Sequence, residues 1–216
     1  MTHMIEPLEF PTQKEVNQFL PDRVPFATLH PDKPLSMGCF NMPEIFTETM
    51  KVKDTALINS KKTIIKIWKE WGKQFGRYYK PVETYRTKDT ETMILTMGSM
   101  GETASVAVDE LRKKGKSVGL VKLRLWRPFP LDELRDAIKG CKTLIVMDRA
   151  VSFGGVGGPV ATEIKSLIFH DKERPRVVNF IMGLGGRDVT VEHFIDMVEK
   201  AAKMKDETYE FYGVRE

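Results

Sequence analysis

An alternation of short apolar runs with amphipathic stretches after Pro81 constrains the fold of this chain more than any other feature. Four runs have the length of buried strands: Met93–Met97, Val118–Leu125, Thr143–Met147 and Arg176–Ile181. Each precedes a stretch with helical spacing, at 102–114, 131–139, 159–169 and 191–203. Consecutive strand–helix units imply a mainly parallel sheet covered by helices on both faces. The sequence therefore predicts an α/β domain over residues 81–205.

The start of the chain follows a different pattern. Seven of the twelve prolines fall before residue 44, and each removes a backbone donor and favours extended geometry in the residue before it. The same segment holds many large apolar side chains, among them Phe10, Phe26 and Phe40. The sequence predicts an extended arm over residues 1–59 that lies along a partner surface.

Residues 60–80 have the spacing of an amphipathic helix. The apolar side chains recur at intervals of three and four residues, at Ile64, Trp68, Trp71, Phe75 and Tyr78. Residues 61–80 also contain seven basic residues and one acidic residue, Glu70. The favoured interpretation is that the aromatic stripe docks on the α/β domain and the lysines are solvated. The alternative is a cationic protein that binds phosphate backbones or anionic lipid through residues 61–80.

A short acidic tail, residues 206–216, closes the chain. It carries Tyr209, Phe211 and Tyr212. We expect these aromatic side chains to pack at a surface.

Composition excludes several classes of protein. With 41% apolar and 30% charged residues, the chain can bury a globular core, and no apolar run reaches the ~18–20 residues that span a bilayer. We expect neither a membrane anchor nor a secretory signal. The two cysteines, Cys39 and Cys141, form no metal-binding spacing and fit a reducing cytoplasm. A net charge of +4 is too small to indicate a nucleic-acid partner.

Three loops rich in glycine follow predicted strands. Ligands of open parallel sheets gather at the carboxyl ends of the strands, where these loops lie. One interpretation is that the loops form an edge that binds an anion or another chain. The other is that the glycines only allow tight turns, and this is the favoured interpretation for any single loop. The candidate residues are Gly98, Ser99 and Gly101, then Arg149, Ser152, Gly154, Gly155, Gly157 and Gly158, then Gly183, Gly185, Gly186 and Arg187.

Two pairs of adjacent opposite charges, Asp148-Arg149 and Arg187-Asp188, lie at the same predicted edge. Arginine in these pairs fits a substrate carboxylate. The favoured interpretation is that ion pairs between the two loops hold them together.

The common nucleotide and hydrolase fingerprints are missing. A dinucleotide site needs Gly-x-Gly-x-x-Gly, but the sixth position is Val160 counted from Gly155 and Asp188 counted from Gly183. The phosphate-binding loop of nucleotide hydrolases and the Gly-x-Ser-x-Gly elbow of serine hydrolases are also missing. The four histidines have no metal-ligand spacing and are interpreted as surface or capping residues. No catalytic or metal-binding residue is predicted.

Several motifs together resemble one family. They are Glu6-Pro-Leu-Glu-Phe-Pro, Phe19-Leu-Pro, Gly98-Ser-Met-Gly-Glu-Thr-Ala, Arg127-Pro-Phe-Pro, Asp148-Arg-Ala-Val-Ser-Phe-Gly and Gly183-Leu-Gly-Gly-Arg-Asp-Val. In this order and spacing, the chain resembles the α chain of the pyruvate:ferredoxin oxidoreductases, within the 2-oxoacid:ferredoxin oxidoreductase family, in the part after its N-terminal domain. The resemblance covers essentially the whole chain and implies a fold like the transketolase C-terminal domain.

The resemblance also implies a reaction. The family decarboxylates a 2-oxoacid oxidatively with coenzyme A on thiamine diphosphate and magnesium, and passes electrons through iron–sulfur clusters to ferredoxin. Two isolated cysteines cannot hold a four-iron cluster, and no Gly-Asp-Gly diphosphate motif is present. We therefore expect a non-catalytic structural part that binds no cofactor alone and assembles with thiamine-binding and iron–sulfur subunits. A stand-alone module that binds anions or nucleotides through the glycine loops remains an alternative.

Overall fold

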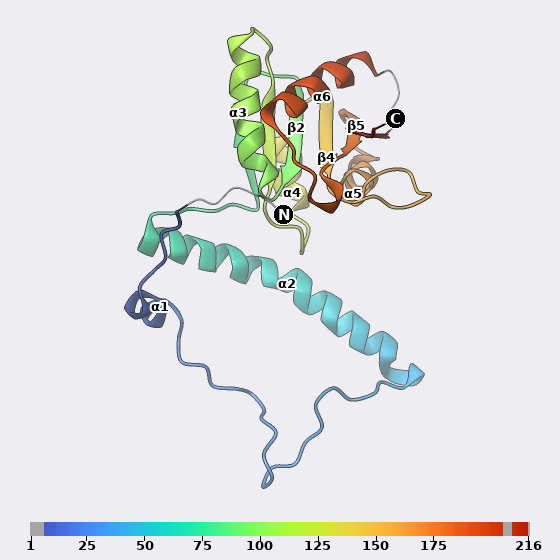
Figure 1. Ribbon diagram of the computed structural model, residues 1–216. Coiled ribbons are helices and arrows are strands. Elements are labelled where there is room, and N and C mark those ends of the chain that lie inside the picture. Colours follow the sequence, from blue (N-terminus) through green and yellow to red (C-terminus); the bar gives the residue numbers. More distant parts are fainter. Residues whose placement is uncertain (1–6, 205–208, 216) are drawn as a thin grey trace. The chain divides into compact units, whose positions relative to one another are not determined.

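The computed structural model describes residues 7–204 and 209–215 (Figure 1). The start of the predicted arm, the Glu6 motif position, residues 205–208 and Glu216 lie outside the described residues. The chain divides into two compact units whose boundary lies between Tyr78 and Tyr79. No helix among the described residues is long and apolar enough to cross a membrane.

The second unit is built on one six-stranded sheet with the strand order β1-β3-β2-β4-β5-β6. β1 runs antiparallel to β3, and every other neighbouring pair is parallel. The mainly parallel sheet predicted from the apolar runs is confirmed. The strands are β1 (Val82–Tyr85), β2 (Thr92–Met97), β3 (Gly119–Leu123), β4 (Thr143–Asp148), β5 (Arg176–Ile181) and β6 (Tyr209–Phe211).

Helices cover both faces of this sheet. Helix α3 (Met100–Lys113) and helix α6 (Val191–Lys203) pack on one face, where Ile94 and Phe180 are buried with them. Helix α4 (Leu131–Ala137) and helix α5 (Pro159–Ile168) pack on the other face over Leu95 and Val146. Successive strand side chains point to opposite faces, so strands buried on both sides must be apolar throughout. The predicted α/β class is confirmed.

Two strands at the edges of the sheet were not predicted. β1 is only four residues long and half of its residues are polar, so its sequence resembles a loop. β6 lies in the predicted tail and pairs with β5, and the backbone N–H of Tyr212 donates to the carbonyl of Ile181 at 2.9 Å. The ring of Tyr212 stands nearly perpendicular to Phe180, with 6.3 Å between ring centroids. The tail therefore extends the sheet.

The first unit contains two helices, α1 (Gln13–Phe19) and α2 (Pro43–Phe75). The prediction of an extended arm over residues 1–59 is wrong where these helices lie. α1 falls inside the predicted arm, and α2 is a 33-residue helix that already begins at Pro43. Proline suits the first helical turn, where its missing N–H would have no partner within the helix. The helix ends at Gly76, whose φ of +70° closes the last turn.

Aromatic side chains join α1 to the end of α2. The ring of Phe19 lies 5.3 Å from that of Trp71 in an edge-to-face arrangement, and the rings of Trp71 and Phe75 are 4.2 Å apart. The side-chain amide of Gln74 donates to the carbonyl of Glu15 at 3.2 Å. Part of the predicted aromatic stripe thus has its partner in α1, within the same unit.

Candidate site at the carboxyl edge of the sheet

The three glycine-rich loops leave the carboxyl ends of β2, β4 and β5, which run parallel and share one edge of the sheet. The sequence prediction placed them there through topology alone. The contacts of each loop show whether its glycines allow a tight turn, allow close packing or are available to bind a ligand.

At the end of β4, the carboxylate of Asp148 is fully buried and holds the start of α5. Its two oxygens accept the backbone N–H groups of Val160 and Ala161 at 2.9 and 3.1 Å. The side-chain amide of Asn179 donates to the same carboxylate at 3.0 Å. Burial raises the pKa of Asp148, and these hydrogen bonds oppose the rise. The expected ion pair between loops is therefore wrong for Asp148, which anchors a helix.

Two glycines allow α5 to begin this close to β4. A Cβ on Gly158 would lie 2.2 Å from Cγ of Asp148, and one on Gly157 would lie 2.8 Å from Oδ1 of Asn179. The N–H of Gly158 donates to that same Oδ1 at 2.8 Å. These two positions are therefore explained by packing. Within the same loop, the N–H of Gly155 donates to the carbonyl of Ser152, and Gly154 has a φ of +71°.

The loop after β2 has a packing role as well. Gly98 turns the chain with a φ of +73°, and Ser99 precedes α3 without a hydrogen bond from its side chain to the helix. A Cβ on Gly101 would lie 3.1 Å from Cδ of Lys122 on β3, so the glycine lets α3 approach the sheet. An anion-binding role for this loop stays a prediction.

The loop after β5 makes the contacts that link the edge together. Gly183, Gly185 and Gly186 have φ values of +66°, +64° and +86°, which only glycine adopts readily. The guanidinium of Arg149 lies 3.4 Å from the carbonyl of Gly183, and that of Arg187 donates to the carbonyl of Gly213 in the tail. These arginines therefore connect the loops by bonding to backbone carbonyls.

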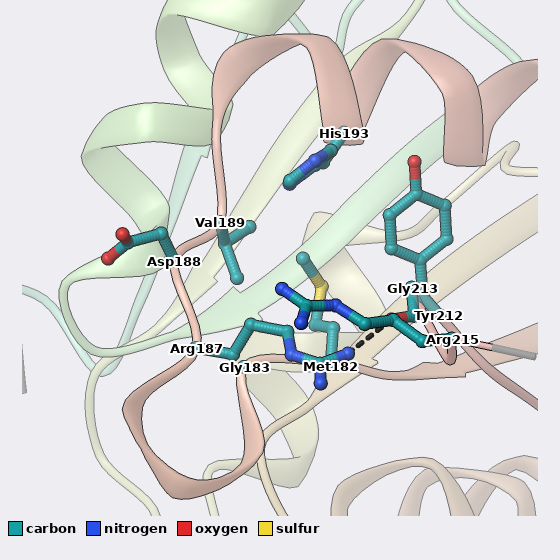
Figure 2. A pocket seen from close by; sticks show the side chains of 9 residues that line it. All are labelled: Met182, Gly183, Arg187, Asp188, Val189, His193, Tyr212, Gly213 and Arg215. Carbon is teal, nitrogen blue, oxygen red and sulfur yellow. Dashed lines mark hydrogen bonds between the residues drawn. The ribbon is translucent and has the colours of Figure 1, made fainter.

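A pocket of 340 Å³ lies where this loop meets helix α6 and the tail (Figure 2). Its charged and aromatic lining comes from Arg187 and Asp188 in the loop, His193 in α6, and Tyr212 and Arg215 after β6. A second pocket of 320 Å³ shares Arg187, Tyr212 and Arg215. Of the candidate residues in the glycine-rich loops, Gly183 and Arg187 line these two pockets. The glycines and serines after β2 and β4 do not line either of them.

Hydrogen bonds fix two of the rings that line this pocket. The hydroxyl of Tyr212 donates to Asp196 at 2.8 Å, and burial together with that carboxylate raises the pKa of Tyr212 to about 12. The phenol is therefore neutral. Nδ1 of His193 accepts the backbone N–H of Thr190 at 3.2 Å, which confirms the capping interpretation for this histidine. In the neutral ring, Nε2 then carries the proton and is a donor.

The described residues do not fit a metal or cluster site. They contain no group of three or more His, Cys, Asp or Glu side chains arranged to hold a metal ion. Cys39 is exposed and Cys141 is buried, and burial raises the pKa of Cys141 to about 11, which disfavours the thiolate that a cluster needs. Neither magnesium nor an iron–sulfur cluster therefore has a fitting set of ligands in the described part of the chain.

Residues 90–194 match the family described as pyruvate:ferredoxin oxidoreductase core domain II. The α/β unit thus carries a domain of the pyruvate:ferredoxin oxidoreductase class. The chain is 40% identical to pyruvate synthase subunit PorA of Methanothermobacter thermautotrophicus over 93% of its own length and 51% of that protein. It belongs to the family of pyruvate:ferredoxin oxidoreductase α subunits.

The chain is also similar to proteins that carry other names. The chain is 36% identical to ketoisovalerate oxidoreductase subunit VorA of Pyrococcus horikoshii, over 94% of this chain and 52% of that one. The 2-oxoglutarate:ferredoxin oxidoreductase of Magnetococcus marinus aligns at 21% identity with a TM-score of 0.42, over 68% of this chain and 23% of that one. The chain spans about half the length of the two curated relatives.

Proposed function

We propose that this chain is a structural, non-catalytic part of a thiamine-diphosphate-dependent 2-oxoacid:ferredoxin oxidoreductase. The complex would convert pyruvate and coenzyme A to acetyl-CoA and CO₂ while two electrons reduce ferredoxin. Thiamine-binding and iron–sulfur subunits would supply the reactive groups, and this chain would supply a folded domain and a contact surface. The likeness to PorA supports the complex, and the likeness to VorA leaves ketoisovalerate as the competing substrate.

The exposed apolar surface of the first unit carries this proposal. Phe10, Phe26 and Phe40 are 79%, 107% and 85% exposed. Residues of this kind continue through Leu8, Leu20, Val24, Leu29, Ile45, Phe46 and Ile58. Monomeric proteins rarely expose so much apolar surface in one segment, so it supports contact with other subunits. Phe153 and Val156, exposed at the tip of the loop after β4, support a further contact.

Anaerobic purification from the native organism through a tag on this chain tests the proposal. The purified complex should reduce viologen in a reaction that depends on both pyruvate and coenzyme A, and should contain thiamine and iron. The recombinant chain alone should show no such activity. Turnover by the recombinant chain would reject the non-catalytic role, and a native preparation without 2-oxoacid-dependent reduction would reject membership in the complex.

Matched variants test the contact surface. F26D and F40D should lower the activity recovered with the tag, because a carboxylate in an apolar interface is costly. F169D places the same charge on a residue that is 62% exposed at the end of α5, and should leave recovery unchanged. Equal recovery from all three variants would contradict the proposed contact.

A further inference from the structure

Two arginines from distant parts of the chain meet in the pocket at the tail. Arg187 follows β5 and Arg215 follows β6, and both line the 340 Å³ pocket (Figure 2). In the view of Figure 2, both guanidinium groups project toward the middle of the cavity, and both arginines also line the second pocket of 320 Å³. Two like charges repel at short range, so an arrangement of this kind favours a bound anion between them.

The hydrogen bonds of these arginines leave donors available. Arg187 donates to the carbonyl of Gly213, which holds its side chain across the pocket. Arg215 makes no hydrogen bond or ion pair with any residue in 7–204 or 209–215. Asp188 lines the same pocket, but Figure 2 shows its carboxylate turned away from both guanidinium groups, beyond Val189. A guanidinium has five N–H donors, so the pair offers more donors than the protein accepts.

We propose that this pocket binds the phosphate group of a small phosphorylated organic molecule. The proposal goes beyond the assembly role and adds a ligand site to the carboxyl edge of the sheet.

The number of donors favours phosphate over carboxylate. One guanidinium fork matches the two oxygens of a carboxylate, whereas a phosphate monoester has three oxygens and up to two negative charges. Arg187 from the loop after β5, Arg215 from the tail and His193 from α6 all line the pocket, so three separate elements bring N–H donors to it. A single carboxylate would leave part of this set unused.

The rest of the lining favours an organic ester over free phosphate. Tyr212 is held by its bond to Asp196, and its ring lines the pocket together with the apolar side chains of Met182 and Val189. The volume of 340 Å³ exceeds what one phosphate fills and lies in the range of roughly 300–1,000 Å³ that small-molecule sites occupy. The apolar wall provides contact area for the organic part of the ligand.

Calorimetric titration of the full chain at low salt tests the site, with phenyl phosphate, inorganic phosphate and acetate as probes. Phenyl phosphate should bind saturably at one site, inorganic phosphate several-fold more weakly, and acetate at least tenfold more weakly than phenyl phosphate. A wild-type chain that shows no saturation up to about 10 mM phenyl phosphate would overturn the proposal. Equal affinity for phenyl phosphate and inorganic phosphate would contradict a preference for an organic ester. Equal affinity for phenyl phosphate and acetate would contradict a preference for a phosphate group.

Variants locate the binding. R215Q should weaken phenyl phosphate binding at least tenfold with an unchanged circular dichroism spectrum, since Arg215 has no partner among the described residues whose loss would disturb the fold. R174Q removes an exposed arginine that precedes β5, at the opposite edge of the sheet, and should bind as the wild type does. Wild-type affinity in R215Q, or the same loss in R174Q, would overturn the assignment.

Discussion

At the residue scale, the buried carboxylate of Asp148 explains why the β4–α5 loop is rich in glycine. It accepts hydrogen bonds from two backbone N–H groups at the start of α5, which are shielded from water, and from the side-chain amide of Asn179 in β5. We expect D148A to lower the free energy of unfolding by about 2–4 kcal/mol, because these donors lose their acceptor inside the core. Urea denaturation measures the change. D136A, at an exposed position of α4, should cost less than about 0.5 kcal/mol.

The titration of Asp148 affects stability with the opposite sign to that of most carboxylates. Burial raises its pKa in the folded state, so the folded protein holds this proton at a pH where the unfolded chain has released it. Its contribution to stability is therefore complete below the unfolded pKa of about 3.9 and is lost as pH rises through the folded value. The stability of D148N relative to the wild type should rise with pH above about 4.

Urea denaturation at several pH values measures that difference. The same difference between D136N and the wild type provides the baseline. A constant difference for D148N, or one that favours the wild type as pH rises, would contradict the raised pKa.

Gly158 tests the close approach of α5 to β4. The Cβ of G158A would overlap Cγ and Cβ of Asp148, at 2.2 and 2.4 Å, so we expect a loss of about 2–3 kcal/mol in the free energy of unfolding. G154N is the matched change in the same loop, because Gly154 has open space around it and asparagine tolerates its φ of +71°. Equal stability of the two variants in thermal denaturation would show that the overlap is relieved without cost.

At the element scale, residue patterns predicted the elements that bury both sides of the sheet. β5 and α6 have the predicted ends, because Arg176–Ile181 is a largely apolar run after one arginine and Val191–Lys203 has an unbroken helical stripe. β1 and β6 were missed because four and three residues are too short to show a period. The start of α2 was missed because Pro43 was counted as part of the arm, although proline in a first turn is a known start signal.

The candidate site likewise has a part that the sequence predicted and a part that it did not. Topology placed the loops of Arg149, Arg187 and their glycines at one edge. The pocket also needs His193 from α6, and it needs Tyr212 and Arg215, which the pairing of β5 with a three-residue strand brings there. No local pattern encodes that pairing. The buried role of Asp148 was missed because its partners Val160, Ala161 and Asn179 are separated from it by 12 to 31 residues.

Helix α1 depends on its contact with α2. It has seven residues and buries none of them fully, so a capping box alone does not sustain it in water. F19A should therefore remove the contact with Trp71 and Phe75 and release α1. Hydrogen exchange should then speed up at the backbone amides of Val16 and Leu20, with residues 79–204 unchanged. F10A removes an equally large but exposed ring and should leave exchange in α1 as it is.

At the scale of the whole molecule, the two units differ in how much core each contains. Both clusters of buried apolar side chains lie entirely between Val82 and Ala201, on the two faces of the sheet. In the first unit, the buried residue in α2 is Gly72. Apolar burial is the main driving force of folding, so the second unit holds nearly all of the stabilising core among the described residues.

A fragment of residues 79–216 should therefore fold by itself and unfold in urea with the midpoint and slope of the full chain's main transition. The slope depends on the surface exposed on unfolding, so an equal slope means that the cooperative unit is the sheet and its four helices. A fragment of residues 1–78 should show helical circular dichroism without a cooperative transition, because its exposed apolar side chains lack a partner. A main transition whose slope falls on removal of residues 1–78 would instead show that the long helix α2 belongs to the same folding unit as the sheet.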